Sequence, residues 1–363
     1  MVKICSVRLK NRVFKARTGD ILLDAALVNG VNLPHDCRAG LCGSCLTRVV
    51  KGSTILGETA VPGMVYACQA RILADLEIEA DEVPAVANAD GRIIALRQLA
   101  PDVIEVTIEP ERRMLHLAGQ YFKFKFEGFP IRSYSPTRPL ERRKQGSNIT
   151  LQVRRQKGGR VSSQLGREIR VGHPVAVEGP YGSAFFREGK TGRLVLVSSG
   201  TGFAPVWSIA YAALRENPER QIVVIAGVRT DDPIYMAPGL ARIAQFPNVD
   251  ILVTIGRRPS ASDAVREGYP TDHLPRLTAD DTVYACGPAH MIETLAPVVV
   301  RSKALFYCDP FEPAPETNDR VMVESAKRLR RYLIPEGGFG LPLSNAFPVL
   351  GQARKEINAD ATG

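Results

Sequence analysis

The chain has 363 residues, of which 45% are hydrophobic and 23% are charged, so it is long enough for two or three globular domains. No run approaches the roughly 20 apolar residues of a membrane-spanning helix, which excludes an integral membrane protein of that kind. The formal charge is +9, yet no nucleic-acid-binding motif accompanies the basic residues, so we expect neither nucleic acid nor a membrane as a partner.

The N-terminal segment MVKICSVRLKNRVFKARTGD alternates apolar and charged residues, which predicts a β-hairpin over residues 3–17 rather than a signal peptide. A helix is expected near residues 20–29, beginning at Asp20. Seven cysteines, an odd number without an export signal, argue against a disulfide framework. We therefore expect a cytoplasmic protein.

Four cysteines crowd into the stretch CRAGLCGSC and the later VYACQA: Cys37, Cys42, Cys45 and Cys68. The spacing C-x4-C-x2-C with a distant fourth cysteine is that of plant-type [2Fe–2S] proteins, whereas zinc sites usually contain two C-x2-C-like pairs. Gly40 and Gly43 allow the backbone to wrap closely around a cluster. The sequence therefore predicts a [2Fe–2S] cluster, with structural zinc as the alternative, and Cys5 is expected to be an ordinary buried strand residue.

After Glu82, the Pro- and Ala-rich stretch VPAVANAD predicts a linker. Closely spaced strand-like runs separated by turns then predict a small antiparallel barrel. These runs are residues 91–98, 103–109, 121–127, 148–154 and 174–178.

Within the barrel, the segment IRSYSP places Arg132 and Tyr134 on one face of a strand. A guanidinium can fork onto a phosphate, a tyrosine ring can stack on a planar cofactor, and the Ser135 hydroxyl can reach a ring nitrogen. Without a ligand, the same residues would form only a strand.

The segment KGGRVSSQL, residues 157–165, predicts a glycine turn that enters a helix capped by Ser162 or Ser163. The free amides of such a helix would suit a pyrophosphate, and the alternative is a capped helix without a ligand. Positive charge is densest from Arg138 to Arg160, which is either a solvated loop or a surface for an anionic partner.

Strands and helices alternate in the third part of the chain, which predicts a doubly wound parallel sheet. The strand-like runs are LVLVSSG (194–200), IVVIAGV (222–228), DILVTIG (250–256) and TVYACGP (282–288). In the turn SSGTGFAP, the backbone of Gly200, Thr201 and Gly202 would approach a dinucleotide phosphate, although the full G-x-G-x-x-G fingerprint is absent. The last strand ends at Cys286, at the sheet edge where ligands bind in open α/β sheets.

The segment GVRTDDPIY follows the second strand of this sheet and bears on the choice of nucleotide. Carboxylates such as Asp231 and Asp232 suit ribose hydroxyls, whereas a cation such as Arg229 suits a 2′-phosphate. The two carboxylates favour NADH over NADPH.

A barrel with RSYS and GGRVS, followed by a sheet with SSGTGFAP and ACGP, resembles the ferredoxin–NADP reductase superfamily. With the cysteine-rich domain in front, residues 1–312 resemble the reductase components of bacterial ring-hydroxylating dioxygenases, such as the naphthalene and terephthalate dioxygenase reductases. The resemblance implies a multidomain protein with an α+β ferredoxin (β-grasp) domain, an antiparallel β-barrel flavin domain and an α/β doubly wound nucleotide-binding domain. The implied ranges are 1–83 for the ferredoxin domain, 88–187 for the FAD-binding domain, 188–312 for the NAD(P)H-binding domain and 313–363 for a C-terminal extension of unknown role.

The resemblance also implies roles for single residues. Arg132 would hold the flavin phosphate, Tyr134 would stack on the isoalloxazine, and Ser135 would hydrogen-bond near its N5. Cys286 would lie near the nicotinamide carbon that gives up hydride, so Ser135 and Cys286 are the catalytic candidates. The four cysteines named above would ligate the cluster. The other cofactor-binding candidates are Ser133, Gly159, Arg160, Val161, Ser162, Gly200, Thr201, Gly202, Asp231, Gly287, Pro288 and Phe311.

The implied reaction takes a hydride from NADH to FAD and passes its electrons singly to the [2Fe–2S] cluster, which reduces a terminal oxygenase or its ferredoxin. The segment FYCDPF would bring Asp309 or Phe311 to the flavin, and we expect a monomer. The alternatives are a reductase of a diiron monooxygenase or deoxysugar dehydratase system, and a redox-sensing interaction protein. The basic run AKRLRRY (326–332) belongs either to a loosely ordered tail or to a docking site for an acidic oxygenase.

Overall fold

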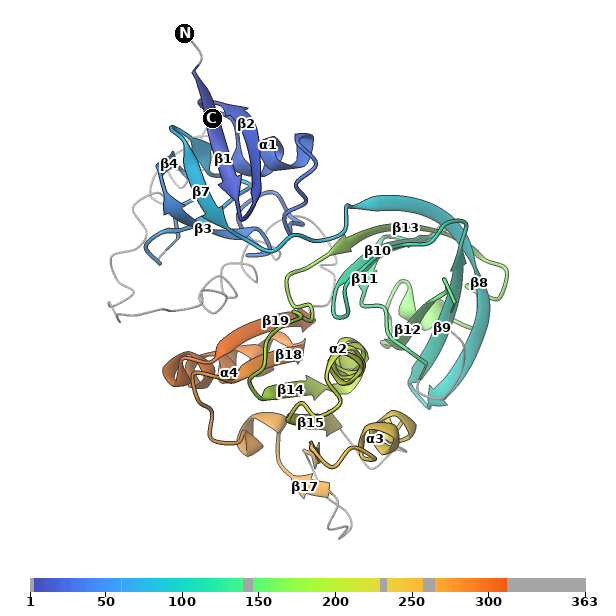
Figure 1. Ribbon diagram of the computed structural model, residues 1–363. Helices are drawn as coiled ribbons and strands as arrows, with labels where there is room; N and C mark the ends of the chain where they lie inside the picture. The colour runs from blue at the N-terminus through green and yellow to red at the C-terminus, as the bar shows by residue number, and fades with distance from the viewer. Residues whose placement is uncertain (1–2, 60, 140–145, 229–233, 257–264, 312–363) are drawn as a thin grey trace, which may run out of the picture.

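The computed structural model describes residues 3–59, 61–139, 146–228, 234–256 and 265–311 (Figure 1). In this part of the chain, three sheets of five or six strands follow one another in sequence, accompanied by a two-stranded sheet. The predicted nucleotide-selecting residues Arg229, Asp231 and Asp232 lie outside the described residues, as does the C-terminal extension. No described helix has the length and apolar character needed to cross a bilayer.

The first sheet has the strand order β2-β1-β7-β3-β5, with β1 and β7 parallel and the other neighbours antiparallel. Its elements are β1 (Ile4–Leu9), β2 (Arg12–Arg17), β3 (Leu46–Lys51), β5 (Met64–Tyr66), β7 (Leu76–Glu79) and helix α1 (Leu22–Val28), with β4 (Thr54–Ile55) and β6 (Arg71–Ile72) in the two-stranded sheet. Alternation buries Cys5, Val7 and Leu9 on one face of β1, which confirms the predicted hairpin and the structural role of Cys5.

Helix α1 begins two residues later than the sequence predicted, with Ile21 in the N-cap position. The Asp20 carboxylate accepts a hydrogen bond from the Arg17 amide (2.7 Å) and so closes the turn after β2 instead of capping the helix. Local side-chain bonds of aspartate compete with capping in this way.

The second sheet is antiparallel throughout and has the strand order β11-β10-β13-β8-β9-β12. Its strands are β8 (Ala87–Ala100), β9 (Val103–Pro110), β10 (Tyr121–Phe126), β11 (Arg132–Tyr134), β12 (Ile149–Arg154) and β13 (Pro174–Tyr181), and each of the five predicted runs matches one of them to within a residue at its ends or lies inside it. A bridge between Thr137 and Thr150 joins the segment after β11 to β12, so the sheet is a nearly closed barrel. Phe122, Phe124 and Phe126 fill its interior.

The predicted linker is shorter than expected, because Ala87 to Asp90 already belong to β8. These residues pair with the segment from Gly179 to Ala176 in β13, and the ladder gives their backbone groups partners that a linker would lack. The helix that the glycine turn in residues 157–165 was predicted to enter, capped by Ser162 or Ser163, is also wrong. Only the single 3-10 turn η1 (Ser162–Gln164) forms, without a side-chain cap, and Gly166 follows with a φ of +83°.

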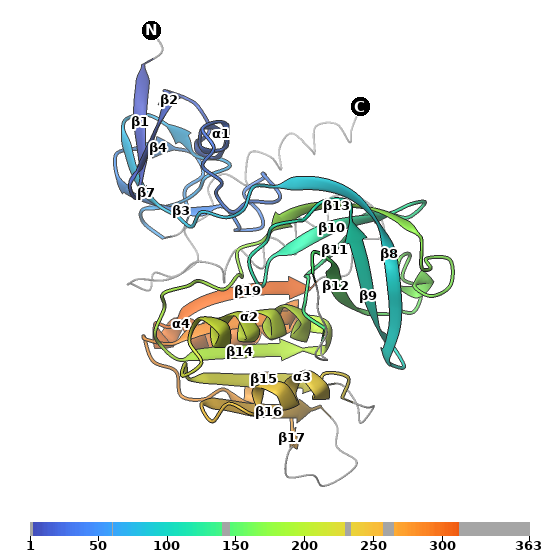
Figure 2. The ribbon, with the colours of Figure 1, turned by 45° about the vertical axis from the view of Figure 1, so that its right-hand side comes forward.

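The third sheet is parallel and has the strand order β17-β16-β15-β14-β18-β19. Its strands are β14 (Leu194–Ser199), β15 (Ile222–Val228), β16 (Val249–Ile255), β17 (Val265–Glu267), β18 (Thr282–Pro288) and β19 (Leu305–Phe311), and the predicted runs are confirmed as strands. Helices α2 (Phe203–Glu216) and α3 (Ala237–Ile243) cover one face, and α4 (Ala289–Ser302) covers the other (Figure 2). Two short 3-10 turns connect elements of this sheet: η2 (Gly200–Gly202) lies between β14 and α2, and η3 (Pro270–His273) lies between β17 and β18.

Helix α2 contacts both this sheet and the barrel. Its Trp207 side chain is 1% exposed and packs in the core, and the indole Nε1 donates a hydrogen bond to the Arg138 carbonyl (3.1 Å). The Thr137 hydroxyl donates to the Ala204 carbonyl (2.8 Å). The segment that continues β11 is therefore bonded to the first two turns of α2.

The parallel sheet contains a two-point ion pair at the amino ends of β14 and β18. Arg193 donates to Asp281 through Nε (2.9 Å) and Nη2 (2.8 Å), and the Asp281 side chain is 4% exposed. Burial alone would raise the pKa of Asp281, but the hydrogen bonds from Arg193 and Thr278 together hold it below its usual value.

We expect Asp281→Ala to lower the free energy of unfolding by about 2–3 kcal/mol at pH 7, because it leaves the half-buried Arg193 without its partner. The loss should shrink as the pH falls through the depressed pKa of Asp281, since the protonated wild type also loses the ion pair. Urea unfolding measures both effects. Asp280→Ala, at the exposed neighbouring position, is the control, and equal stability of the two variants would contradict the assignment.

Candidate functional site

The four cysteines predicted to hold a cluster lie together in two pairs. Cys45 and Cys68 come from different segments, and their Sγ atoms are 3.3 Å apart. In the other pair, the Cys42 amide donates a hydrogen bond to the Cys37 Sγ (3.3 Å), and the Ala39 amide also donates to it (3.4 Å). The loop before β3 and the segment after β5 thus supply the four thiols.

Each pair contains one thiol that ionises readily. The hydrogen bond from Cys42 lowers the pKa of Cys37 to about 5, and the hydrogen bond from Cys45 lowers the pKa of Cys68 to about 6. The same bonds, with burial, raise the pKa values of Cys42 and Cys45. Since the thiolate is the form that binds metals, each cysteine pair is suited to bind a metal ion.

The donor set fits a two-iron cluster better than a zinc ion. The described residues contain no group of three or more His, Cys, Asp or Glu side chains around a single metal position. Two cysteine pairs match a [2Fe–2S] cluster, in which four cysteines are divided between two irons. Gly40 has a φ of +69°, and a Cβ there would lie 2.9 Å from the Gln69 Cγ, so the loop needs glycine at this position.

The predicted flavin strand β11 faces the carboxyl edge of the parallel sheet. Ser135 follows this strand, is 7% exposed, and its hydroxyl donates a hydrogen bond to the Asp309 Oδ2 (3.3 Å). Asp309 in β19 is paired in register with Cys286 in β18. The two predicted catalytic residues, Ser135 and Cys286, are thus brought together through Asp309.

The other residues of β11 lie as an alternating strand requires. Arg132 and Tyr134 are partly buried while Ser133 is exposed, and the Tyr134 ring packs beside Phe124 with centroids 6.0 Å apart. Within the part of the chain that the structure describes, the Arg132 guanidinium hydrogen-bonds only to the neighbouring Ile131 carbonyl (2.8 Å).

Asp309 is the most strongly perturbed carboxyl of this region. Burial raises its pKa to about 7, against a smaller opposing effect of the Ser135 hydrogen bond, and the charge of Asp36 adds to the increase. A carboxyl with such a pKa can hold or release a proton at neutral pH.

The glycine turn η2 lies where a dinucleotide phosphate was predicted. A Cβ on Gly202 would lie 2.0 Å from the Cys286 carbonyl oxygen, so glycine permits the turn to touch the end of β18. Arg154 approaches from β12: its Nη2 is 3.4 Å from the Cβ position of Gly200, and its Nη1 is paired with Asp102 (3.3 Å). Backbone amides and a cation therefore meet at one point, which suits a phosphate.

Arg154 was not predicted as a binding residue, because the run QVRR alone does not say which face of its strand meets the sheet. Gln152 shares the face of Arg154, is 5% exposed, and neither polar atom of its amide has a hydrogen-bond partner in the described part of the chain. Buried polar atoms without partners are rare, and here they fit a polar ligand between barrel and sheet.

In the turn predicted to bind pyrophosphate, the serine side chains make their hydrogen bonds to the backbone of the same turn. The Ser162 hydroxyl accepts a hydrogen bond from the Gln156 amide (3.1 Å), Ser163 donates to the Gly159 carbonyl, and Val161 is buried. Arg160 at this turn is exposed. At the sheet edge, Phe311 is paired in register with Pro288, and Gly287 has a φ of +155°.

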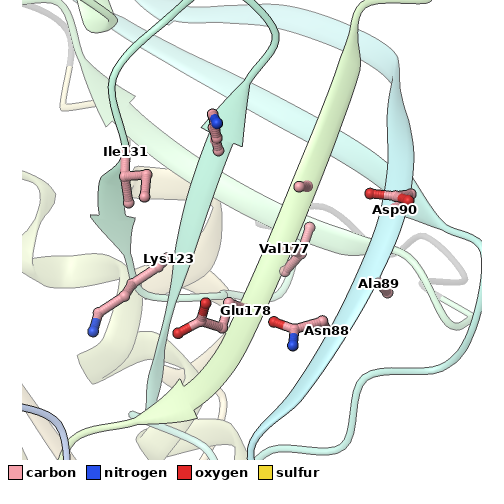
Figure 3. Close-up of a pocket in the computed structure, with 9 residues that line it drawn as sticks. Asn88, Ala89, Asp90, Lys123, Ile131, Val177 and Glu178 are labelled. Atoms are coloured by element: carbon pink, nitrogen blue, oxygen red, sulfur yellow. The ribbon is translucent and has the colours of Figure 1, made fainter.

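A surface hollow lies elsewhere, on the outer face of β8, β10 and β13. Its volume is about 270 Å³, and it is lined by residues such as Asn88, Asp90, Lys123 and Glu178 (Figure 3). It contains none of the predicted site residues. The Lys123 amino group points away from the hollow.

We expect Cys68→Ser to remove iron and the iron–sulfur absorbance while leaving the flavin absorbance in place, since Cys68 supplies one of the paired thiols. Cys5→Ser is the matched control, because Cys5 is buried in the same core as Cys68 but is not one of the four paired cysteines. Iron analysis and the visible spectrum measure the effect. Normal iron content in Cys68→Ser would contradict the ligand assignment.

Comparison with known families gives three matches in the order of the sheets. Residues 7–73 match the 2Fe-2S iron-sulfur cluster binding domain, residues 93–186 the oxidoreductase FAD-binding domain, and residues 196–296 the oxidoreductase NAD-binding domain. A [2Fe–2S] cluster, FAD and NAD(H) are accordingly the cofactors of this chain.

Curated relatives align over most of the chain. The reductase component of naphthalene 1,2-dioxygenase/salicylate 5-hydroxylase systems from a Ralstonia species is 31% identical over 324 residues, covering 84% of this chain and 97% of the relative. The ferredoxin–NAD(+) reductase component of the alkene monooxygenase system of Xanthobacter autotrophicus is 30% identical, with 81% and 95% covered. Terephthalate 1,2-dioxygenase reductase component 1 from a Comamonas species is 26% identical, with 83% and 95% covered.

Solved structures show the same fold. A cytochrome P450 reductase from Amycolatopsis superposes with a TM-score of 0.64 at 26% identity, covering 86% of this chain and 100% of that structure. The ferredoxin reductase of carbazole 1,9a-dioxygenase superposes with a TM-score of 0.58 at 21% identity, with 86% and 99% covered.

Proposed function

Since this chain belongs to the family of ferredoxin–NAD(P)+ reductase components of oxygenase systems, we propose that it moves electrons from NADH to a ring-hydroxylating dioxygenase. The chain is an NAD(P)H-dependent iron–sulfur flavoprotein oxidoreductase that delivers electrons to an oxygenase. The observation that carries the proposal is the meeting of Ser135, Asp309 and Cys286 between barrel and sheet, with the cysteine pairs on the adjoining domain.

When bound, FAD would supply the chemistry that takes a hydride from NADH and passes its two electrons singly to the [2Fe–2S] cluster, and the cluster would supply a strong one-electron donor to the outside partner. The protein supplies distances, orientation and electrostatics for this chemistry. Cys37, Cys42, Cys45 and Cys68 would hold the cluster.

In the flavin region, Arg132 would bind phosphate and Tyr134 would pack against the ring system, since both lie on one face of β11. The hydroxyl of Ser135 and the thiol of Cys286 would orient the reacting atoms. Asp309, bonded to Ser135, would hold or accept a proton beside them.

In the nucleotide region, the amides of Gly200, Thr201 and Gly202 would bind the NADH phosphates together with Arg154. Asp231 would select NADH through its ribose, and Gly287, Pro288 and Phe311 would line the nicotinamide end. The remaining FAD-binding candidates are the residues of the turn from Gly159 to Ser162.

We further propose the domain ranges 1–83, 88–187 and 188–312, with a β-grasp ferredoxin domain, a flavin-binding barrel and a doubly wound nucleotide-binding domain. The monomeric state and the cytoplasmic location stay predictions. A second candidate function is the reduction of a monooxygenase, because the alkene monooxygenase relative, at 30% identity, lies within the 26–31% range of the dioxygenase relatives.

The test is anaerobic addition of NADH to the purified, cofactor-loaded chain. Flavin and iron–sulfur absorbance should both bleach, with NADPH acting more slowly, and the reduced protein should then support turnover of an added dioxygenase. A protein that contains both cofactors but is left unchanged by NADH would refute electron transfer. Turnover of a monooxygenase but not of a dioxygenase would favour the second candidate.

We expect Asp309→Asn to raise stability relative to the wild type increasingly as the pH rises from about 4 to about 7, and by a constant amount above that. The raised pKa means that the protonated carboxyl is favoured by folding, so the wild type loses stability over this range while the amide does not. Thermal unfolding at several pH values measures the effect, with exposed Asp90→Asn as the control. A pH-independent difference would contradict the burial of a titrating carboxyl.

A further inference from the structure

The loop that carries the first cluster cysteine lies directly against the barrel. The residue before Cys37, Asp36, accepts a hydrogen bond from the Tyr121 hydroxyl (2.7 Å) and forms an ion pair with Lys123. The side chains of Asp36 and Lys123 are only 18% and 30% exposed, so water and salt screen the pair incompletely. Tyr121 and Lys123 both belong to β10, the strand next to β11.

An aromatic ring completes this contact. The Lys123 Nζ lies 4.1 Å from the centroid of the Tyr181 ring, and His35 meets the same ring edge-on with centroids 6.3 Å apart. Gly182 has a φ of +92°, and a Cβ there would lie 2.9 Å from the Tyr121 ring, so glycine leaves the space that the tyrosine fills. We call His35, Asp36, Tyr121, Lys123 and Tyr181 the interdomain junction.

The interdomain junction adjoins the flavin strand. In the ladder of β10 with β11, Lys123 is opposite Ser133, and Phe122 is opposite Tyr134. Burial raises the pKa of Tyr121, and the charges of Asp36 and Asp309 raise it further.

A second attachment holds the first domain at another point. Asp81, after β7, forms an ion pair with Arg187 (2.7 Å), whose guanidinium lies between the rings of Phe185 (4.1 Å) and Tyr307 (3.6 Å). In both ribbon views the first domain lies beside the barrel, above the β19 edge of the parallel sheet (Figures 1 and 2). Two attachments at separate points restrict rotation as well as separation.

We propose that the interdomain junction positions the cluster for internal electron transfer, with Asp36, Tyr121 and Lys123 holding the Cys37 loop against the flavin strand. This inference rests on the proposed function. The step it serves moves one electron at a time from NADH-reduced flavin to oxidised cluster, and no bond of the junction residues forms or breaks. These are positioning residues, since they act through the orientation of the loop.

The first measurement is hydrogen exchange of the full-length, cofactor-loaded chain. Lys123→Met keeps the stem of the side chain over Tyr181 but removes the charge, and Tyr121→Phe removes only the hydroxyl. We expect amide protection in residues 33–40 and 119–124 to fall about tenfold in each variant, which corresponds to about 1.4 kcal/mol. Lys125→Met is the matched control, because Lys125 is an exposed lysine on the same face of β10 with no ion pair in the described part of the chain.

The second measurement is stopped-flow absorbance after anaerobic mixing with NADH. The flavin should bleach at the wild-type rate in all variants, whereas iron–sulfur bleaching should slow about tenfold in Lys123→Met and Tyr121→Phe alone. Wild-type protection and wild-type iron–sulfur bleaching in both variants would overturn the proposal, as would equal slowing of both phases, which indicates a defect at the flavin site.

The two proposals fail differently. If the wild type itself does not bleach with NADH, the proposed function fails, while hydrogen exchange still reports whether the junction holds the loop. If Tyr121→Phe has a lower iron content than the wild type, Lys123→Met decides the question, because Lys123 lies at the partly exposed rim and its loss leaves the barrel core intact.

Discussion

Helix α2 packs on the parallel sheet and also bonds to the segment that continues β11, and the arrangement of the site depends on both contacts. Its apolar side chains, including Phe203 and Trp207, pack in the core of the parallel sheet. Its first turns bond to the segment that continues the flavin strand, through Thr137 and the Arg138 carbonyl. Because Gly202 has no Cβ, the helix starts in backbone contact with Cys286. A shift of α2 would therefore move the glycine turn away from the flavin strand. It would also move this turn away from the catalytic candidates.

Charge is divided unevenly around this helix. On the nucleotide side, Arg154 offers a cation that Asp102 offsets in part, since the Asp102 side chain is 46% exposed. Beside the flavin strand, Asp309 resists ionisation because it is desolvated. At the proposed site the anionic phosphates of a dinucleotide would thus meet positive charge, while Asp309 would carry less negative charge at pH 7 than an ordinary carboxylate. A negative charge there would oppose the arrival of a hydride, so the division favours the reaction.

Most of the fold follows from short-range patterns. Alternation in β1 and the apolar runs of β14, β15 and β18 each depend on a few neighbouring residues, and the four-cysteine spacing is equally local. The helix expected after Gly159 failed because Ser162 and Ser163 bond back to their own turn, which a propensity argument does not weigh. The sequence did not indicate a role for Asp36, because its partners lie 85 and 87 residues away along the chain and are brought close only by domain packing. Arg154 was missed for the same reason, because its strand had to be placed before its side chain could be.

The segment between the first domain and the barrel is not a free tether. The Val83 amide donates a hydrogen bond to the Asn32 carbonyl (2.9 Å), and Asp81 is paired with Arg187, so the connection is held at two points before β8 begins at Ala87. Modular proteins are often treated as interchangeable parts on flexible connectors. In a hybrid made by exchanging the first domain for that of another reductase, a correct fold of each part would not suffice. The incoming domain would also need carboxylates where Asp36 and Asp81 stand, so recombination between such proteins is constrained by a surface that belongs to neither domain alone.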